Sequence, residues 1–293
     1  MFSLLKIISF LLGHMPLGLV HILGRVFGRL IYKYDKKRRK ITLDNIDRAY
    51  RDELTQEKKQ EIAQKVFVNL AKMFFEFTRI PWLNQKSFIK LVKVHGTENL
   101  AKALEKKKGV ILCTGHFGNW ELFGASFGHI GFKLDVVARE LDSPVLEQFV
   151  KWVRTRSGNV IISKNRAMRK LMRRLADNGI VTILLDQNVA LAEGVFVDFF
   201  SVPACTNKGP ALLAATTGAA VVPAFIIRHG SGYRLEIQKE LELTFTGDRE
   251  RDALENTARC TKAIEDIVRK HPEQWFWVHR RWKTRPPQTG QPI

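Results

Sequence analysis

The sequence predicts an α/β fold, with a mixed central sheet covered by helices and a membrane-associated helix at the N-terminus. Three observations support this prediction. Short apolar runs alternate with helical segments from residue 97 onward, and polar side chains directly follow two of these runs. The N-terminal residues are apolar and lead into a basic stretch. We therefore expect a membrane anchor or interfacial helix over 1–35 and one globular domain over 36–293.

The N-terminal segment is apolar but interrupted. Between residues 2 and 27 its unbroken apolar stretches are shorter than the roughly 20 residues of a clean membrane span. A basic cluster follows between Arg25 and Lys40, and no small-residue cleavage site indicates a removed signal peptide. Three interpretations stay open: a short anchor with its basic flank in the cytoplasm, an amphipathic helix lying in the membrane interface, or a buried helix of a soluble domain.

The segments that follow alternate between helix and strand patterns. Thr55–Arg79 is an expected amphipathic helix because apolar residues recur at four-residue steps, with Thr55 as N-cap and Pro81 beyond its end. The other expected helices are Thr97–Lys107, Trp120–Phe127, Pro144–Arg156, Asn165–Asp177, Ala211–Thr217 and Arg251–Arg269. The expected strands are Val110–Cys113, Leu134–Val137, Val160–Ile162, Val181–Leu185, Val221–Ile227 and Arg234–Ile237.

Composition indicates a globular protein that attracts anions. The chain has 293 residues, 45% of them hydrophobic, and a net charge of +19. Such a charge attracts nucleic acid, anionic lipid, phosphorylated substrates or an acidic carrier protein. Its three cysteines form no CxxC pair, which argues against a disulfide framework or a zinc site. No G-x-S-x-G, P-loop or H-E-x-x-H motif occurs, so a covalent serine mechanism lacks its usual signature and no metal is expected.

The most informative motif is Gly115–Glu121, which follows the apolar run 110–113. On a regular helix His116 and Glu121 would point about 140° apart, but the glycines at 115 and 118 permit a turn. We expect this turn to bring Glu121 onto the His116 ring. A carboxylate on one ring nitrogen fixes the tautomer and leaves the other nitrogen as a general base for a substrate hydroxyl. The alternative is an ordinary surface pair.

A second polar cluster, Asp186-Gln187-Asn188, follows the expected strand 181–185. Reactive groups in α/β sheets gather beyond the carboxyl ends of strands, so this cluster and His116 are expected to meet in one cleft. Asp186 either faces that cleft or caps the following turn. Arg139 after a strand and Arg154 on a helix are candidate phosphate clamps, with a solvated helix or loop surface as the alternative.

The sequence leaves the roles of two further segments open. Gly194–Ser201 is more apolar than a loop needs, so it lines an acyl-chain tunnel or forms a core strand. Pro272–Lys283 mixes aromatic and cationic residues. That mixture is typical of a membrane-interface belt, a nucleic-acid surface or a packed C-terminal cap.

Together these motifs resemble the lipid A biosynthesis acyltransferases, the lauroyl and myristoyl transferases that add secondary acyl chains. The resemblance covers nearly the whole chain, and its ending is the most specific part. The matching features are the apolar N-terminus, the basic segment with Asn45, His116-x-x-x-x-Glu121, Arg139 and Arg154 around Pro144, Asp186-Gln187-Asn188, Phe199-Phe200 before Pro203–Pro210, Gly218–Pro223 and Pro272–Pro286.

The resemblance implies a glycerolipid-acyltransferase-like fold at the cytoplasmic face of the inner membrane, with 36–293 as the acyltransferase domain. It implies His116 and Glu121 as the catalytic pair, without metal or cofactor. The donor would be an acyl-carrier-protein thioester and the acceptor a hydroxyl of a lipid A precursor, giving an acyl-oxyacyl product. Membrane lipids would be partners and nucleic acid would not. The expected substrate-binding residues are Asn119, Arg139, Arg154, Asp186 and Gln187, and either the Asn119 side chain or backbone amides near the turn would stabilise the oxyanion.

Two departures from the family pattern leave acceptor and chain length open: Asn188 stands where many members have an acidic residue, and Ser201 where Gly or Ala is frequent. One alternative is the same chemistry on a glycerophospholipid or mannosylated lipid, or with a coenzyme A donor. Another is a basic protein that binds nucleic acid or a membrane surface. Polar residues at two strand ends argue against this last alternative, because binding a phosphate backbone needs neither cluster.

Overall fold

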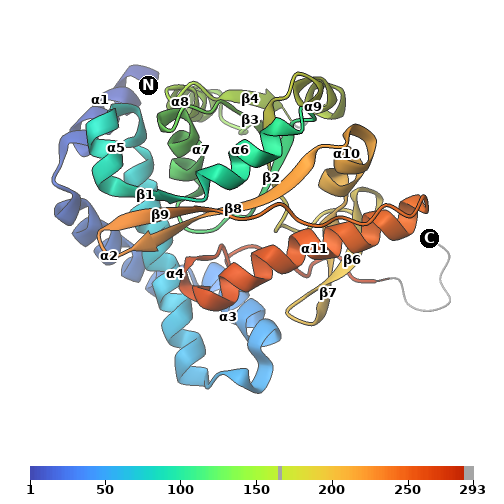
Figure 1. Ribbon diagram of the computed structural model, residues 1–293. Helices are drawn as coiled ribbons and strands as arrows, with labels where there is room; N and C mark the ends of the chain where they lie inside the picture. Colours follow the sequence, from blue (N-terminus) through green and yellow to red (C-terminus); the bar gives the residue numbers. More distant parts are fainter. Residues whose placement is uncertain (164–166, 287–293) are drawn as a thin grey trace.

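The computed structural model describes residues 1–163 and 167–286. Its centre is a seven-stranded sheet with the order β1-β9-β8-β2-β5-β3-β4, and β6 pairs with β7 in a separate hairpin (Figure 1). The strands are β1 (Val92–His95), β2 (Val110–Thr114), β3 (Leu134–Ala138), β4 (Val160–Ser163), β5 (Ile180–Leu184), β6 (Gly194–Phe199), β7 (Val202–Asn207), β8 (Ala220–His229) and β9 (Gly232–Ile237).

The sheet is mixed, as predicted. Neighbouring strands pair in parallel except β8 and β9, which form an antiparallel hairpin. All five residues of β2 are buried, and they divide between two cores. Ile111 and Cys113 belong to the core on one face, whereas Val110 and Leu112 belong to the other. This alternation follows from the two-residue period of a strand, and it explains why a strand buried on both faces reads as a continuous apolar run.

Helices cover both faces of the sheet. In Figure 1, α11 runs along one face while α6 and α7 lie on the other. The helices are α1 (Phe2–His14), α2 (Leu17–Tyr34), α3 (Lys36–Tyr50), α4 (Gln56–Phe77), α5 (Gln85–Leu91), α6 (Thr97–Glu105), α7 (Trp120–His129), α8 (Pro144–Thr155), α9 (Ala167–Ala176), α10 (Gly209–Thr217) and α11 (Arg249–Lys270). A short 3-10 turn, η4 (Pro272–Gln274), follows α11.

The helices and strands expected from the sequence are present, with ends shifted by a few residues. The Thr55 side chain caps α4 by accepting a hydrogen bond from Lys58 N, as predicted. Residues 165 and 166 of the helix expected at Asn165–Asp177 lie outside the described residues, as do 287–293 of the globular domain. The sequence analysis missed α3, α5, β1 and β7, while β6 fits one of the two interpretations left open for Gly194–Ser201. The four residues of β1 alternate between buried and exposed positions, which is too short a run to stand out from a loop.

The N-terminal segment forms two helices that meet at Pro16. Met15 is extended because a residue before proline disfavours the helical region, and the two axes differ by 115°. Among the described residues no single helix has the length and apolarity to cross a membrane, while α1 and α2 together pass that test as a bent pair. One side of α2 packs on α4, where His21 is buried against Glu76. The division of the chain at residue 35 stays a prediction.

Candidate active site

The polar clusters after β2 and β5 meet at the carboxyl edge of the sheet, as the sequence predicted. The two strands pair in parallel with Thr114 opposite Leu184, so the residues just beyond them start side by side. His116 Nδ1 lies 2.9 Å from Asp186 Oδ1. The His116 backbone N–H donates to Asp186 Oδ2 at 2.8 Å. One carboxylate therefore holds both the ring and the backbone of His116.

Two glycines make this approach possible. A Cβ on Gly115 would lie 3.1–3.2 Å from side-chain atoms of Asp186, tighter than an ordinary contact. Gly118 has a φ of +59°, and a Cβ there would lie 1.8 Å from the Ile226 carbonyl oxygen. Any other residue at 118 would strain the backbone and strike β8. The Gly115–Gly118 turn is thus the shape that places His116 beside Asp186.

The C-terminal segment closes over this turn. Gly118 N donates to Gln274 O at 2.9 Å, and Phe276 N donates to His116 O at 3.0 Å. Trp275 Nε1 donates to Asp186 Oδ2 at 2.7 Å, and the Trp275 side chain is 1% exposed. Of the three interpretations of Pro272–Lys283, the packed C-terminal cap is confirmed. Sequence reasoning missed that Trp275 donates to Asp186. The available signal was the tryptophan itself, because a buried indole N–H usually finds a hydrogen-bond acceptor.

The apolar segment Gly194–Ser201 is a core strand and its turn. It forms β6, and Phe199 and Phe200 are each 1% exposed. Their rings pack against Trp275 and Trp277 of the C-terminal cap. These two phenylalanines therefore support the floor of the site and do not line an acyl-chain tunnel.

The electrostatics of Asp186 keep its carboxylate ionised and hold His116 in one orientation. Burial would raise the pKa of Asp186, but the charge and hydrogen bonds of His116 outweigh it and hold that pKa well below its usual value. An ionised Asp186 retains the proton on His116 Nδ1, which leaves Nε2 as an acceptor. The His116 side chain is 23% exposed, and its Nε2 makes no hydrogen bond to another described residue. His116 therefore presents a free basic nitrogen.

Glu121 does not contact the His116 ring, which corrects the expected pairing. Its carboxylate accepts hydrogen bonds from Arg154 Nε and Nη2 at 2.9 and 2.6 Å. The turn ends at Asn119, where α7 begins, so regular helix geometry directs Glu121 toward α8 and away from the ring. Asp186 takes the expected position because parallel strand pairing, which spacing along the chain does not show, brings it there.

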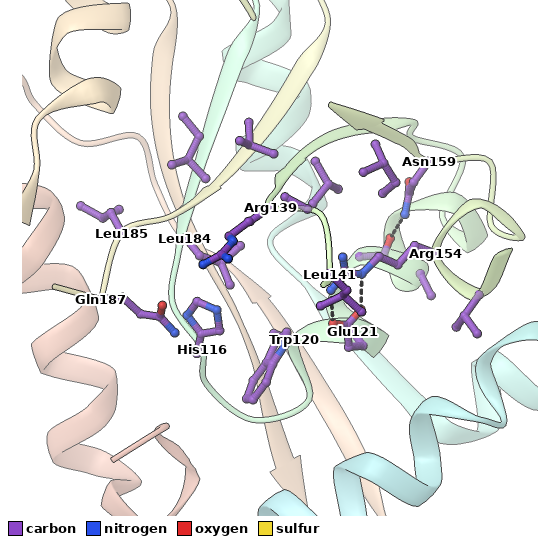
Figure 2. A pocket seen from close by; sticks show the side chains of 18 of the residues that line it. His116, Trp120, Glu121, Arg139, Leu141, Arg154, Asn159, Leu184, Leu185 and Gln187 are labelled. Atoms are coloured by element: carbon purple, nitrogen blue, oxygen red, sulfur yellow. Dashed lines mark hydrogen bonds and ion pairs between the residues drawn. The ribbon is translucent and has the colours of Figure 1, made fainter. Parts of the chain in front are cut away.

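A cavity of about 530 Å³ opens in front of His116. Its polar wall includes His116, Glu121, Arg139, Arg154 and Gln187, which Figure 2 shows around one hollow. The rest of the lining is mostly apolar side chains from the strand ends and helices, including Val136, Val137, Leu141, Val153, Ile161, Ile183 and Leu185. Ligand pockets of about 300–1,000 Å³ usually combine an apolar wall with a few polar groups. This cavity suits a ligand with an apolar chain and a polar reacting end.

The expected arginines occupy different positions in this cavity. Arg154 is committed to Glu121, and its side chain is 28% exposed. The Arg139 side chain is 80% exposed and contacts the exposed Asp142 at 3.2 Å. Exposed pairs of this kind are worth only about 0–1 kcal/mol, so Arg139 is available to an incoming anion.

Asn119 lies away from the cavity, contrary to its expected role in substrate binding. Its side chain is completely buried and caps α7 by accepting a hydrogen bond from Leu122 N at 3.0 Å. Its amide nitrogen donates to Glu76 Oε2 at 3.1 Å. Asparagine immediately before a helix is a favoured N-cap, so the sequence did contain this signal.

The described residues contain neither a metal centre nor an activated thiol. Within residues 1–163 and 167–286, no group of three or more His, Cys, Asp or Glu side chains is placed to hold a metal ion. Cys113, Cys205 and Cys260 are free and buried. The hydrogen bond with Cys260 and burial raise the pKa of Cys113 well above its usual value, and burial raises that of Cys205. These shifts disfavour reactive thiolates.

Comparison with known proteins identifies the family. A family model described as "Bacterial lipid A biosynthesis acyltransferase" matches residues 1–284. The lipid A biosynthesis lauroyltransferase of Escherichia coli K12 is 28% identical over 284 residues, which cover 95% of this chain and 90% of the relative. The palmitoleoyltransferase of the same strain is 29% identical, covering 93% of this chain and 87% of the relative.

A relative that uses another lipid also matches. A phosphatidylinositol mannoside acyltransferase of Mycobacterium tuberculosis (strain CDC 1551 / Oshkosh) is 27% identical over 217 residues, which cover 71% of this chain and 66% of the relative. The family model nonetheless spans both polar clusters of the cavity and nearly the whole sequence. The chain is therefore an acyltransferase and belongs to the bacterial lipid A biosynthesis acyltransferase family.

Proposed function

We propose that the protein transfers a fatty acyl chain from an acyl-carrier-protein thioester to a hydroxyl of a lipid A precursor. The observation that carries this proposal is the His116–Asp186 pair, whose free Nε2 belongs to a side chain lining a half-apolar cavity. Family membership supports the lipid A acceptor. The net charge of +19 favours an acidic carrier protein and a phosphorylated lipid as partners.

His116 acts as the general base in the proposed reaction. Its Nε2 takes the proton of the acceptor hydroxyl while the hydroxyl oxygen attacks the thioester carbonyl carbon. The tetrahedral intermediate collapses as the carbon–sulfur bond breaks, and the departing thiolate takes the proton back from His116. Asp186 stabilises the imidazolium between these steps, and its contacts to His116 N and Trp275 Nε1 keep it in position.

The remaining polar residues are proposed to hold the substrates. Arg139, exposed at the cavity, contacts a phosphate of the acceptor or of the pantetheine arm, and Gln187 lies beside His116 to contact the reacting groups (Figure 2). Glu121 and Arg154 form a charged section of the wall in which each neutralises the other. The acyl chain lies along the apolar wall formed by the ends of β3 and β5.

We also propose that the protein works at the cytoplasmic face of the inner membrane. Several apolar side chains of α1 and α2 are about half exposed, including Leu4, Ile7, Leu11, Ile22, Val26 and Leu30. Basic residues begin within this segment at Arg25 and continue beyond it to Lys40, as is typical of a cytoplasmic flank. The apolar surface would place the cavity within reach of membrane-bound acceptors.

The decisive experiment is product analysis with defined substrates. Detergent-solubilised protein is incubated with lauroyl, myristoyl and palmitoyl thioesters of acyl carrier protein or coenzyme A, and with a lipid A precursor or a phosphatidylinositol mannoside. Mass spectrometry then identifies which acceptor gains a chain. An acylated lipid A precursor supports the proposal, and exclusive acylation of the mannoside would replace it with the activity named for the mycobacterial relative.

The same assay tests the base. His116→Ala should lower turnover by about 10²–10⁴-fold, the usual contribution of a positioned general base. The control is Trp120→Phe, which keeps an aromatic ring beside His116 and should retain most activity. Near-normal turnover of a folded His116→Ala variant would refute the proposed role.

A further inference from the structure

A second cavity, separate from the active site, lies between α2 and α4. Its volume is about 720 Å³, and it shares no lining residue with the cavity in front of His116. Five cations line it: Arg25, Arg29, Lys65, Lys72 and Arg228. Among the lining residues, Glu273 is the single carboxylate. The lining therefore carries a large excess of positive charge.

Three of these cations have no partner within the described part of the chain. Lys65 is paired with Glu61, and Arg228 with Glu76. Arg25, Arg29 and Lys72 make no ion pair or hydrogen bond to any other described residue. Lys72 is partly buried, and burial together with the charges of Arg228 and Arg25 lowers its pKa. An anion in the cavity would relieve this repulsion.

Close contact between the two helices creates the arrangement. A Cβ on Gly24 would lie 2.5 Å from Lys72 Cγ, and one on Gly28 would lie 2.5 Å from Val68 Cα. These two glycines, four residues apart, let α2 lie closer to α4 than larger residues would allow. Arg25 and Arg29 directly follow them, so both arginines stand on the same flank of α2 beside Lys72.

The surroundings indicate where the anion comes from. On a helix of 3.6 residues per turn, Arg25 and Arg29 lie between the packed glycine face and the exposed apolar face of α2. That apolar face includes Ile22, Val26 and Leu30, which are 47%, 50% and 45% exposed. Arginine and lysine beside such a surface place their charges at the level of lipid headgroups. A phosphate attached to an acyl chain fits both features, whereas free phosphate fits only the cations.

We propose that the α2–α4 cavity binds the phosphate of an anionic membrane-lipid headgroup, through Arg25, Arg29 and Lys72. This site holds the protein on the membrane by a specific headgroup contact, in addition to the apolar surface of α1 and α2. It does not rest on the proposed acyl transfer, because the two cavities are lined by different residues.

Vesicle flotation with the full-length protein tests the site. Neutral phosphatidylcholine vesicles are doped either with phosphatidic acid or with a diacylglycerol hemisuccinate, an anionic lipid without an added phosphate, at equal surface charge. The test variants are Arg25→Gln/Arg29→Gln and Lys72→Met, with Lys72→Arg as the charge-conserving partner. The matched control is Arg169→Gln/Arg173→Gln, which removes two exposed arginines at the same spacing from α9.

The wild type should bind phosphatidic acid vesicles more tightly than hemisuccinate vesicles. Arg25→Gln/Arg29→Gln and Lys72→Met should each weaken binding to phosphatidic acid by about tenfold, equivalent to ~1.4 kcal/mol, while hemisuccinate binding changes little. Lys72→Arg should still prefer phosphatidic acid vesicles. The α9 variant should weaken binding to the two vesicle types equally, and by less than the test variants weaken binding to phosphatidic acid. Acyl transfer to a detergent-dispersed acceptor should be unchanged in the Arg25→Gln/Arg29→Gln variant.

Three results would overturn the proposal. Equal losses on both vesicle types, matching those of the α9 variant, would mean that the arginines act only as general surface charge. Unchanged binding of the Arg25→Gln/Arg29→Gln variant to phosphatidic acid vesicles, together with loss of its binding to inorganic phosphate, would indicate a site for free phosphate. Loss of binding to acyl carrier protein in the Lys72→Met variant, with vesicle binding intact, would assign the cavity to the protein partner. Circular dichroism and thermal unfolding of each variant confirm that it is folded.

Discussion

At the scale of single residues, Asp186 organises the site because three donors converge on its buried carboxylate. They are the His116 ring, the His116 backbone and the Trp275 indole. These contacts fix the ring before substrate arrives, so the reaction does not have to order it. Glu121, by contrast, lies in the same cavity wall but is neutralised by Arg154. The two carboxylates therefore have different roles: Asp186 orients His116, and Glu121 forms part of the cavity lining with Arg154.

Nitrogen NMR of the His116 ring tests whether Asp186 or Glu121 determines its tautomer. In the wild type the Nδ1 position should carry the proton, because Asp186 accepts it. Asp186→Asn should shift the tautomer population and lower kcat by about 10²–10⁴-fold. Glu121→Gln should leave the tautomer unchanged while lowering activity, since it leaves Arg154 without its charge partner. A tautomer change in Glu121→Gln and none in Asp186→Asn would restore the pairing that the sequence suggested.

His279 is expected to make the free energy of unfolding depend on pH. Burial lowers the pKa of His279 to about 4, and its Nε2 has no hydrogen-bond partner among the residues that the structure describes. Because the folded pKa lies below the unfolded value of about 6.5, the folded state disfavours the charged ring. This contribution is fully present above pH ~6.5 and is lost as the pH falls toward ~4, by about 3 kcal/mol in total. His279→Gln should show a smaller loss of unfolding free energy over that range than the wild type, measured by denaturant titration. An identical pH dependence in the two proteins would contradict the assignment.

At the scale of elements, a buried polar network joins the N-terminal helices to the catalytic turn. Glu76 on α4 accepts from His21 on α2, Arg228 on β8, Tyr233 on β9 and Asn119 at the start of α7. Burial would raise the pKa of Glu76, but the charge of Arg228 and these hydrogen bonds lower it to about 2. Deleting the first 29 residues would expose this network, so such a deletion tests folding as well as membrane binding.

Point substitutions on α1 test membrane binding without that complication. Ile7 and Leu11 are 57% and 61% exposed, so replacing both with aspartate should leave the fold intact and place charge in the apolar surface. Ile7→Asp/Leu11→Asp should move much of the protein from the membrane fraction to the supernatant. The matched control is Met168→Asp/Leu254→Asp, on α9 and α11, where the apolar side chains are also about half exposed. Equal release of both variants, or of neither, would argue against α1 as the contacting surface.

At the scale of the whole molecule, the parallel pairing of β2, β5 and β3 brings the polar residues that follow β2 and β5 to one edge of the sheet. The cavity has room for an apolar chain and a reacting group together, and the three cysteines are buried away from it. This architecture favours direct transfer between two bound substrates over a covalent acyl-enzyme.

Direct transfer predicts the kinetics and the labelling. Replacing Cys113, Cys205 and Cys260 together with alanine should leave kcat within a few-fold of wild type, apart from a packing cost of about 1 kcal/mol per site. Initial-rate patterns should intersect and not run parallel. A radiolabelled acyl group should not stay on the denatured protein. Retained label that disappears in one cysteine variant would overturn this mechanism.

The sequence by itself determined most of the helices and strands and their order, the mixed α/β class, the two polar clusters at strand ends and the family. These are local or near-local properties. Periodicity, glycine positions and strand ends can be recognised from residues that are neighbours in the sequence, and the family match extends along the chain. Sequence analysis missed β1 and α5 because four and seven residues are too few to show a clear strand or helix period.

Only the tertiary structure decided which partner each polar side chain meets. Glu121 is five residues from His116, yet Asp186, 70 residues away, reaches the ring because β2 and β5 pair in parallel. Asn119 turns inward to Glu76, and the cationic cavity forms because two glycines let α2 approach α4. Spacing along a chain limits where side chains can point, but strand pairing and helix packing bring distant residues together, and those contacts set the chemistry of this site.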